Sequence, residues 1–132
     1  MRFKNAHEKF MWFIGIYEGE GTLKVDKTKI RLVIAMTDLD VIEECSKFLG
    51  TKVRKIPMYN KDGTVRSYKI KKDGTPMKQQ YEVTKKGGVI RGGQLLNLFS
   101  HMRPYLSKRR LEQLDVKIEQ AKSNSKNKNL LK

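Results

Sequence analysis

The stretch FIGIYEGEG, residues 13–21, constrains the fold more than any other part of the chain. Residues 6–17 have a helical pattern, and residues 10–17 are apolar on nearly every side of that helix. A helix of this kind is buried on more than one face. Gly15 and Gly19 lie one helical turn apart and would form a flat strip where a second backbone could approach closely. The alternative is a single core helix that ends at a glycine.

Charge sets the class of partner. The chain has 29 Lys and Arg residues against 14 Asp and Glu residues, a formal net charge of +15. Such a field favours polyanions, of which nucleic acid is the commonest. A membrane surface is the competing interpretation, but no apolar stretch approaches the ~20 residues of a spanning helix. The single cysteine, Cys45, excludes an internal disulfide and predicts an intracellular, reducing compartment.

Periodicity predicts one α+β domain over residues 1–122, without an internal repeat. Alternation of apolar and polar residues, together with two Asp-Gly turn signals, predicts strands at 22–25, 29–36, 52–58, 65–71 and 78–85. Helical spacing and helix-ending residues predict helices at 6–17, 39–49, 94–102 and 107–122. Residues 123–132 have the composition of a basic, disordered tail.

Two predicted helix ends carry charges of unfavourable sign. Glu18 and Glu20 lie at a helix C-terminus, where acids are disfavoured by about 0.3–1 kcal/mol. Lys108, Arg109 and Arg110 lie in the first turn of the last helix and are unfavourable for the same reason. Carboxylates without a basic partner are candidate ligands for a hard divalent cation, and basic residues at a helix start are candidates for phosphate contact. Together they predict metal-assisted phosphodiester hydrolysis; the alternative is two solvated helix ends.

The opening stretch resembles the nine-residue signature of the LAGLIDADG homing endonucleases. The matching positions are Gly15, Glu18, Gly19, Glu20 and Gly21. The predicted order of elements over residues 6–120 is similar to that family's αββαββα core. MRPYLSKRRLEQ, residues 102–113, also resembles the family's C-terminal segment. The resemblance implies an α+β fold with a LAGLIDADG-type core, in which helices back a basic, antiparallel, saddle-like sheet.

The resemblance also implies an activity. Members of the single-motif type are homodimeric, site-specific double-strand DNA endonucleases that use Mg²⁺, or Mn²⁺ in its place, on long, nearly palindromic targets. The second acid of the motif holds the metal in that family, which implies Glu20 as a ligand with the carbonyl of Gly19 beside it. Two-fold pairing of the first helix would supply two such sites. The implied dimer interface is Phe13, Gly15, Ile16 and Gly19.

Further roles follow for the basic and polar side chains. Lys108 matches the family's basic residue near the scissile phosphate, with Arg109 as the alternative. The polar residue that helps to place the attacking water falls on Thr37 or Asp38. A two-stranded ribbon fits the major groove, where Arg, Lys and Gln are common readers of bases. The residues expected to face DNA are Lys24, Lys29, Arg31, Lys52, Arg54, Arg66, Lys69, Gln79 and Gln80.

Other function classes remain as alternatives. The strongest is a nuclease-dead relative that binds nucleic acid, such as an intron maturase or a repressor, which would need no metal. GGQ, residues 92–94, is a tripeptide of translation release factors, but here it precedes an apolar helix and is better interpreted as a helix start. GIY, residues 15–17, lacks the downstream YIG of the GIY-YIG nucleases. No small-molecule substrate and no membrane partner are expected.

Overall fold

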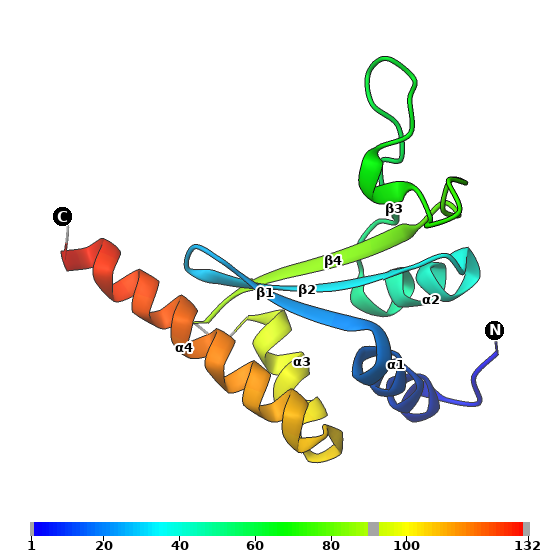
Figure 1. The fold of residues 1–132 in the computed structure, drawn as a ribbon. Coiled ribbons are helices and arrows are strands. Elements are labelled where there is room, and N and C mark those ends of the chain that lie inside the picture. Colours follow the sequence, from blue (N-terminus) through cyan, green and yellow to red (C-terminus); the bar gives the residue numbers. More distant parts are fainter. Residues whose placement is uncertain (1, 90–92, 131–132) are drawn as a thin grey trace.

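The predicted α+β class is confirmed by a computed structural model, which describes residues 2–89 and 93–130. These residues form four α-helices, a four-stranded sheet and two short 3-10 helices (Figure 1). In chain order the elements are α1 (Ala6–Glu20), β1 (Gly21–Asp26), β2 (Lys29–Met36), α2 (Leu39–Leu49), β3 (Arg54–Lys55), η1 (Ser67–Lys69), β4 (Tyr81–Gly88), α3 (Gln94–Met102), η2 (Arg103–Tyr105) and α4 (Lys108–Leu130).

The sheet has strand order β1-β2-β4-β3, and every pairing is antiparallel. Alternate residues of β2, such as Ile30, Leu32 and Ile34, are fully buried on one face. The helices cover this face, and in Figure 1 they lie below the strands. The opposite face carries no α-helix among the described residues, so the sheet has one face covered by helices and one open face.

The junction between α1 and β1 has no loop. Asn5 caps the start of α1, because its side chain accepts a hydrogen bond of 2.8 Å from the N–H of Glu8. At the other end, Gly21 is the first residue of β1 and its N–H donates to the carbonyl of Tyr17. A Cβ at Gly21 would lie 2.4 Å from Cδ2 of Tyr17, so only glycine allows this turn. The last residues of α1 are therefore held beside the edge of the sheet.

The predicted meander between residues 52 and 85 is wrong. Only residues 54–55 and 81–88 of this region form strands of the sheet. Residues 56–80, which we call the arm, form two hairpins with isolated bridges and the short helix η1. The arm rises on the side of the sheet opposite the helices (Figure 1). In the expected strands of this region polar residues are present on both faces and no face is apolar throughout, so the pattern specifies no register in the sheet.

The two hairpins of the arm have the same geometry, eleven residues apart. Oδ1 of Asp62 accepts hydrogen bonds from N (2.9 Å) and Oγ1 (2.6 Å) of Thr64. Oδ1 of Asp73 accepts the same two bonds from Thr75 at the same distances, 2.9 and 2.6 Å. The glycine of each turn has a positive φ, 89° in the first and 84° in the second, as Asp-Gly turns require. The expectation that the chain has no internal repeat is therefore wrong.

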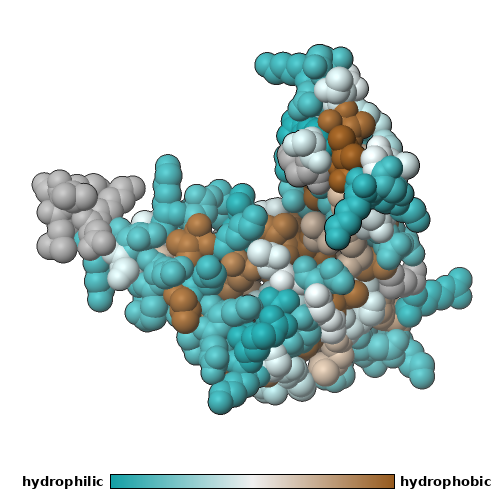
Figure 2. Space-filling view, viewed as in Figure 1, coloured by the Kyte–Doolittle hydropathy of each residue, from teal (hydrophilic) through white to brown (hydrophobic). Residues whose placement is uncertain are grey.

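The two hairpins also share a main-chain hydrogen bond and a buried residue at equivalent positions. The N–H of Arg66 donates to the carbonyl of Met58, and the N–H of Met77 donates to the carbonyl of Lys69, both at 2.8 Å. Met58 and Lys69 are both buried, although one is apolar and the other cationic. Figure 2 shows mainly hydrophilic residues in this view, with a hydrophobic streak on the arm. The arm is thus a duplicated unit, each copy closed by its own hydrogen bonds.

Helix α4 is longer than predicted. It continues to Leu130, so residues 123–130 are helical and the expected disordered tail is wrong for them; residues 131–132 lie outside the described part of the chain. Ala121 is fully buried in the core. Nδ2 of Asn124 donates a hydrogen bond of 2.8 Å to the carbonyl of Lys27, in the turn between β1 and β2. These contacts hold the helix along the first hairpin, which composition alone could not reveal.

Candidate functional site

Glu18 stabilises the junction between α1 and α4. Its Oε1 accepts a hydrogen bond of 2.6 Å from the N–H of Ser107, and its Oε2 accepts one of 2.9 Å from Oγ of Ser107. An acid is unfavourable at the C-terminus of α1, but this carboxylate lies at the N-terminus of α4, where an acid is favourable. The prediction that Glu18 is kept for a ligand outside the fold is therefore wrong.

Arg110 completes the same junction from the side of α4. Only 6% of the residue is exposed, and its Nη2 donates to the carbonyl of Glu18 at 3.0 Å. Its Nη1 donates to Gln113 at 3.1 Å, and the guanidinium lies 4.8 Å from the ring centroid of Tyr17. Burial raises the pKa of Tyr17, while the charge of Arg110 opposes that rise. Arg110 is thus built into the fold, and its basic charge compensates the C-terminal end of α1.

Glu20 has the opposite environment. It is the last residue of α1, it is exposed, and it makes no hydrogen bond or ion pair with any residue that the structure describes. The carbonyl of Gly19 belongs to the same last turn, where helix carbonyls lack intrahelical donors. Carboxylate and carbonyl oxygens are the ligands that hard divalent cations prefer. Within the described ranges no group of three or more His, Cys, Asp or Glu residues could hold a metal ion.

The polar residues predicted after the second strand lie at the same end of the sheet as Glu20. Gly21 pairs with Ile34, so β1 starts where β2 is about to end. Thr37 and Asp38 follow β2 directly, and both are exposed. The structure therefore brings the end of α1 and these two side chains to one edge of the molecule.

Lys108 and Arg109 also lie near the last turn of α1. They follow Ser107, whose N–H and hydroxyl bind Glu18, and both are exposed. The third basic residue of this turn, Arg110, is buried instead. Successive residues of a helix point in directions about 100° apart. Arg110 therefore points into the fold, whereas Lys108 and Arg109 are accessible to a ligand.

The open face of the sheet carries a row of cations. In the strand register Lys24 is opposite Arg31, and Arg31 is opposite Lys86. Like charges directly opposite one another are destabilising. Asp26 compensates part of this charge, with its Oδ2 2.7 Å from Nζ of Lys86 and its charge also acting on Arg31. The hydrogen bond and charge of Lys86 lower the pKa of Asp26. Lys86 was missed because the predicted strand ended at residue 85; extending its alternation by one residue finds it.

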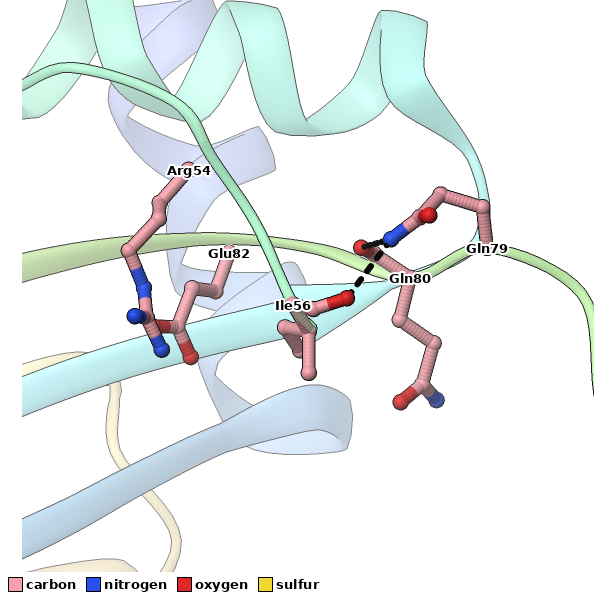
Figure 3. Close-up of polar contacts among 5 residues, drawn as sticks. All are labelled: Arg54, Ile56, Gln79, Gln80 and Glu82. Atoms are coloured by element: carbon pink, nitrogen blue, oxygen red, sulfur yellow. Dashed lines mark hydrogen bonds and ion pairs between the residues drawn. The ribbon is translucent and has the colours of Figure 1, made fainter. Parts of the chain in front are cut away.

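A groove on this face contains polar atoms without partners. Nε of Arg31 and Oγ1 of Thr51 are buried, and neither has a hydrogen-bond partner among the described residues. Both residues line the same groove, together with Lys52, Arg54 and Lys86. The one acid of the groove, Glu82, is bound to Nε of Arg54 at 2.7 Å (Figure 3). Buried donors beside cations are suited to an anionic ligand with hydrogen-bond acceptors.

The remaining residues predicted to face DNA lie off the sheet. Arg66 belongs to the arm, and Lys69 is buried there with its Nζ 2.8 Å from Oε1 of Gln80. Nε2 of Gln79 donates to the carbonyls of Ile56 and Gln80, both at 2.8 Å (Figure 3). Their predicted place on the sheet is wrong, because the strands assigned to 65–71 and to the start of 78–85 do not form. Lys69, Gln79 and Gln80 instead hold the base of the arm together, next to the strands β3 and β4.

The outer side of α1 is flat and apolar. A Cβ added at Gly15 or Gly19 would meet nothing within 4 Å, and Met11, one turn earlier on the same side, is 37% exposed. Ile16 is half-buried beside this strip. Phe13, however, is 0% exposed and lies in the core of its own chain, so we remove it from the expected interface. Met11 takes its place.

Comparison with known proteins adds no identity. No family model matches the chain, and no curated protein matches it. Among the helices of the described residues, none combines the length and the apolar character needed to cross a membrane.

Proposed function

We propose that this protein is a homodimeric, metal-dependent, site-specific double-strand DNA endonuclease of the LAGLIDADG type. The observation that carries the proposal is the contrast within the motif between Glu18, bound to Ser107, and Glu20, which has no partner in the described chain. The order of elements from α1 to α3, helix–strand–strand–helix–strand–strand–helix, also supports it. Glu20 is available for a ligand at the edge of a basic sheet.

DNA would lie on the open face of that sheet. The row formed by Lys24, Arg31 and Lys86 offers charge to the phosphates, and the unpartnered donors of Arg31 and Thr51 offer hydrogen bonds. Lys29 is exposed at the far end of the same face. A face of this kind fits the major groove, where such side chains read bases. Contact with phosphates would make the affinity fall as salt rises.

The donor set of the motif fits a hard cation, but one chain supplies only part of a site. Glu20 and the carbonyl of Gly19 would hold Mg²⁺, and the bound ion would supply charge to polarise the phosphate and activate water. Lys108 or Arg109 would stabilise the negative charge that develops on the phosphate. Thr37 and Asp38 would accept hydrogen bonds from the attacking water and orient it.

A second copy would complete the centre. The strip of Met11, Gly15 and Gly19 allows two α1 helices to cross closely, and an isologous contact would bring both Glu20 carboxylates to the two-fold axis. The target would then be nearly palindromic, with one strand cut by each subunit. If each sheet follows about one helical turn of DNA, the site spans roughly 20 base pairs.

A nuclease-dead relative is the second candidate, as a maturase or a repressor. One observation favours it: the basic groove with its unpartnered donors is complete within one chain, whereas a metal centre is not. Such a protein would bind nucleic acid on the open face and would not need Glu20.

Glu20→Gln tests the proposal. A cleavage selection from a randomised DNA library first identifies the target. We expect the variant to bind that target nearly as the wild type does and to lose cleavage by roughly a thousandfold or more, since metal stabilisation contributes several kcal/mol. The control is Glu43→Gln, at an exposed carboxylate on α2. Full activity of Glu20→Gln would reject the assignment, and a wild type that binds DNA but never cuts it would favour the second candidate.

A further inference from the structure

A second basic groove lies at the outer edge of β1, beside α4. Its strand side is formed by Gly21 and Thr22, and its helix side by Arg109, Gln113 and Lys117, which are spaced by one turn each. Arg110 lines the groove as well, whereas Lys108 does not. Because β1 is an edge strand, this groove is separate from the one on the open face, which Arg31 lines.

Among the described residues that line this groove there are cations and no acid. Its charged lining residues are Arg109, Arg110 and Lys117. Arg110 is more than nine-tenths buried, and its Nε has no hydrogen-bond partner among the residues described, although both Nη atoms do. A buried donor left without an acceptor is destabilising, so this nitrogen is suited to an acceptor that enters the groove, such as a phosphate oxygen or a water.

We propose that this groove binds one phosphate group of the DNA backbone, next to the phosphate on which Glu20 acts. Guanidinium and ammonium groups bind phosphate oxygens strongly, and Gly21 is the residue that follows Glu20 in the chain. Thr22 lines the groove and also lies on the open face, opposite Val33 in the register, so a duplex on that face reaches the groove without a break. The inference rests on the proposed DNA-binding function.

The role is binding and positioning, and it separates Arg109 from Lys108. Lys108 does not line the groove, so it remains the candidate beside the scissile phosphate. Arg109 and Lys117 would instead hold the neighbouring phosphate and fix the strand against the end of α1. Lys117 has no counterpart in the matching motif segments and was found only from the structure.

The test is the double variant Arg109→Gln/Lys117→Gln, with Lys122→Gln on the same helix as the control. Affinity for a duplex carrying the selected target is measured as a function of salt. Loss of one phosphate contact should weaken binding by roughly tenfold and reduce the slope of log K against log salt by about one. Arg109→Gln and Lys117→Gln alone should each reduce the slope by no more than the double variant does, because both residues contact the same phosphate. Thermal unfolding checks that the variants fold.

The outcomes separate this inference from the proposed activity. A double variant with the slope of Lys122→Gln overturns the phosphate site, even if the wild type cuts DNA. A reduced slope in a protein that never cuts DNA supports the site and rejects the nuclease. Inorganic phosphate at matched ionic strength distinguishes the sources. If phosphate raises the melting temperature of the wild type and not of the double variant, while both bind DNA with the same salt slope, the groove is a free-phosphate site and the backbone assignment is overturned.

Discussion

Two pairs of acids show how differently this chain uses the same chemical group. Glu18 and Glu20 are two residues apart on one helix, yet one is bound to Ser107 and the other has no partner in the described chain. Asp62 and Asp73 are eleven residues apart, yet each binds a threonine two residues further on at the same distances, 2.9 and 2.6 Å. Proximity in sequence does not decide the environment of a carboxylate; the location of its partner does.

Acids that have a hydrogen-bond partner within the chain can thus be distinguished from acids that are free to bind a ligand. The aspartates find their partners locally, so the short sequence KDGT is sufficient to build each turn. Glu18 finds its partner 89 residues away, through the packing of α1 on α4. An acid with a partner in the chain contributes to the fold, and Glu20, without one, is the acid we assign to a ligand.

Among the variants that test this comparison without replacing Glu20 itself, the largest effect is expected at the contact between two copies of the chain. In Gly15→Leu the new side chain enters open space in the monomer, so the fold should persist, but it would force two crossing helices apart. We expect dimerisation, measured by light scattering, and double-strand cleavage to be lost together, with cleavage falling by roughly a hundredfold or more. Met11→Leu, on the same strip and of similar size, is the control. A monomeric wild type that makes double-strand breaks would refute the two-fold arrangement.

A smaller effect should separate the two glutamates by stability alone. Glu18→Ala removes the acceptor of the Ser107 N–H and hydroxyl, and we expect the free energy of unfolding to fall by about 1–3 kcal/mol. Glu20→Ala should change it by no more than about 0.5 kcal/mol, as surface substitutions usually do. Urea unfolding of both variants measures the difference. Equal losses would contradict the division into a structural and an available acid.

The smallest effect should be the same in both hairpins. Hydrogen bonds from the side chain and the backbone N–H of Thr64 lower the pKa of Asp62 below its ordinary value of 3.8, and Thr75 lowers that of Asp73 in the same way. Because the folded pKa is depressed, the charged carboxylates stabilise the fold above pH 3.8, and this contribution is lost as the pH falls through the folded pKa values.

The matched variants are Asp62→Asn and Asp73→Asn, which keep the acceptor oxygen and remove the charge. Each should lower the melting temperature slightly at pH 7, by equal and additive amounts, and the difference from the wild type should shrink in acid. Thermal melts between pH 2 and 7 provide the measurement. Unequal effects would show that the two hairpins, despite their geometry, have different electrostatic surroundings.

Sequence reasoning succeeded where periodicity and local chemistry decide the structure. The alternation of β2 predicted the inward positions Ile30, Leu32 and Ile34, all of them buried, and β1 was predicted at 22–25, within one residue of its observed bounds, Gly21–Asp26. It failed where partners are distant. The role of Glu18, the burial of Arg110 and the helical continuation past residue 122 each depend on packing between α4 and the first hairpin or helix.

The arm shows a different kind of failure. Both Asp-Gly turns were recognised, but the strands around them were extended into the sheet, because turn signals do not say how long the paired segments are. Gln79 and Gln80 were therefore given a strand phase that they do not have. Their true role, binding Ile56 and Lys69, depends on where the arm returns to the sheet.

The duplicated hairpin has a consequence for how the gene can change. Met58 and Lys69 hold equivalent places, so an in-frame deletion of residues 59–69 would join Met58 to Ile70 and leave one complete hairpin with the same closing bonds. Duplication of the same eleven residues would add one. The pairing of Arg54 with Glu82 at the base of the arm lies outside the repeated unit. Replication slippage can thus lengthen or shorten the arm in whole steps, and leave the register of the sheet unchanged.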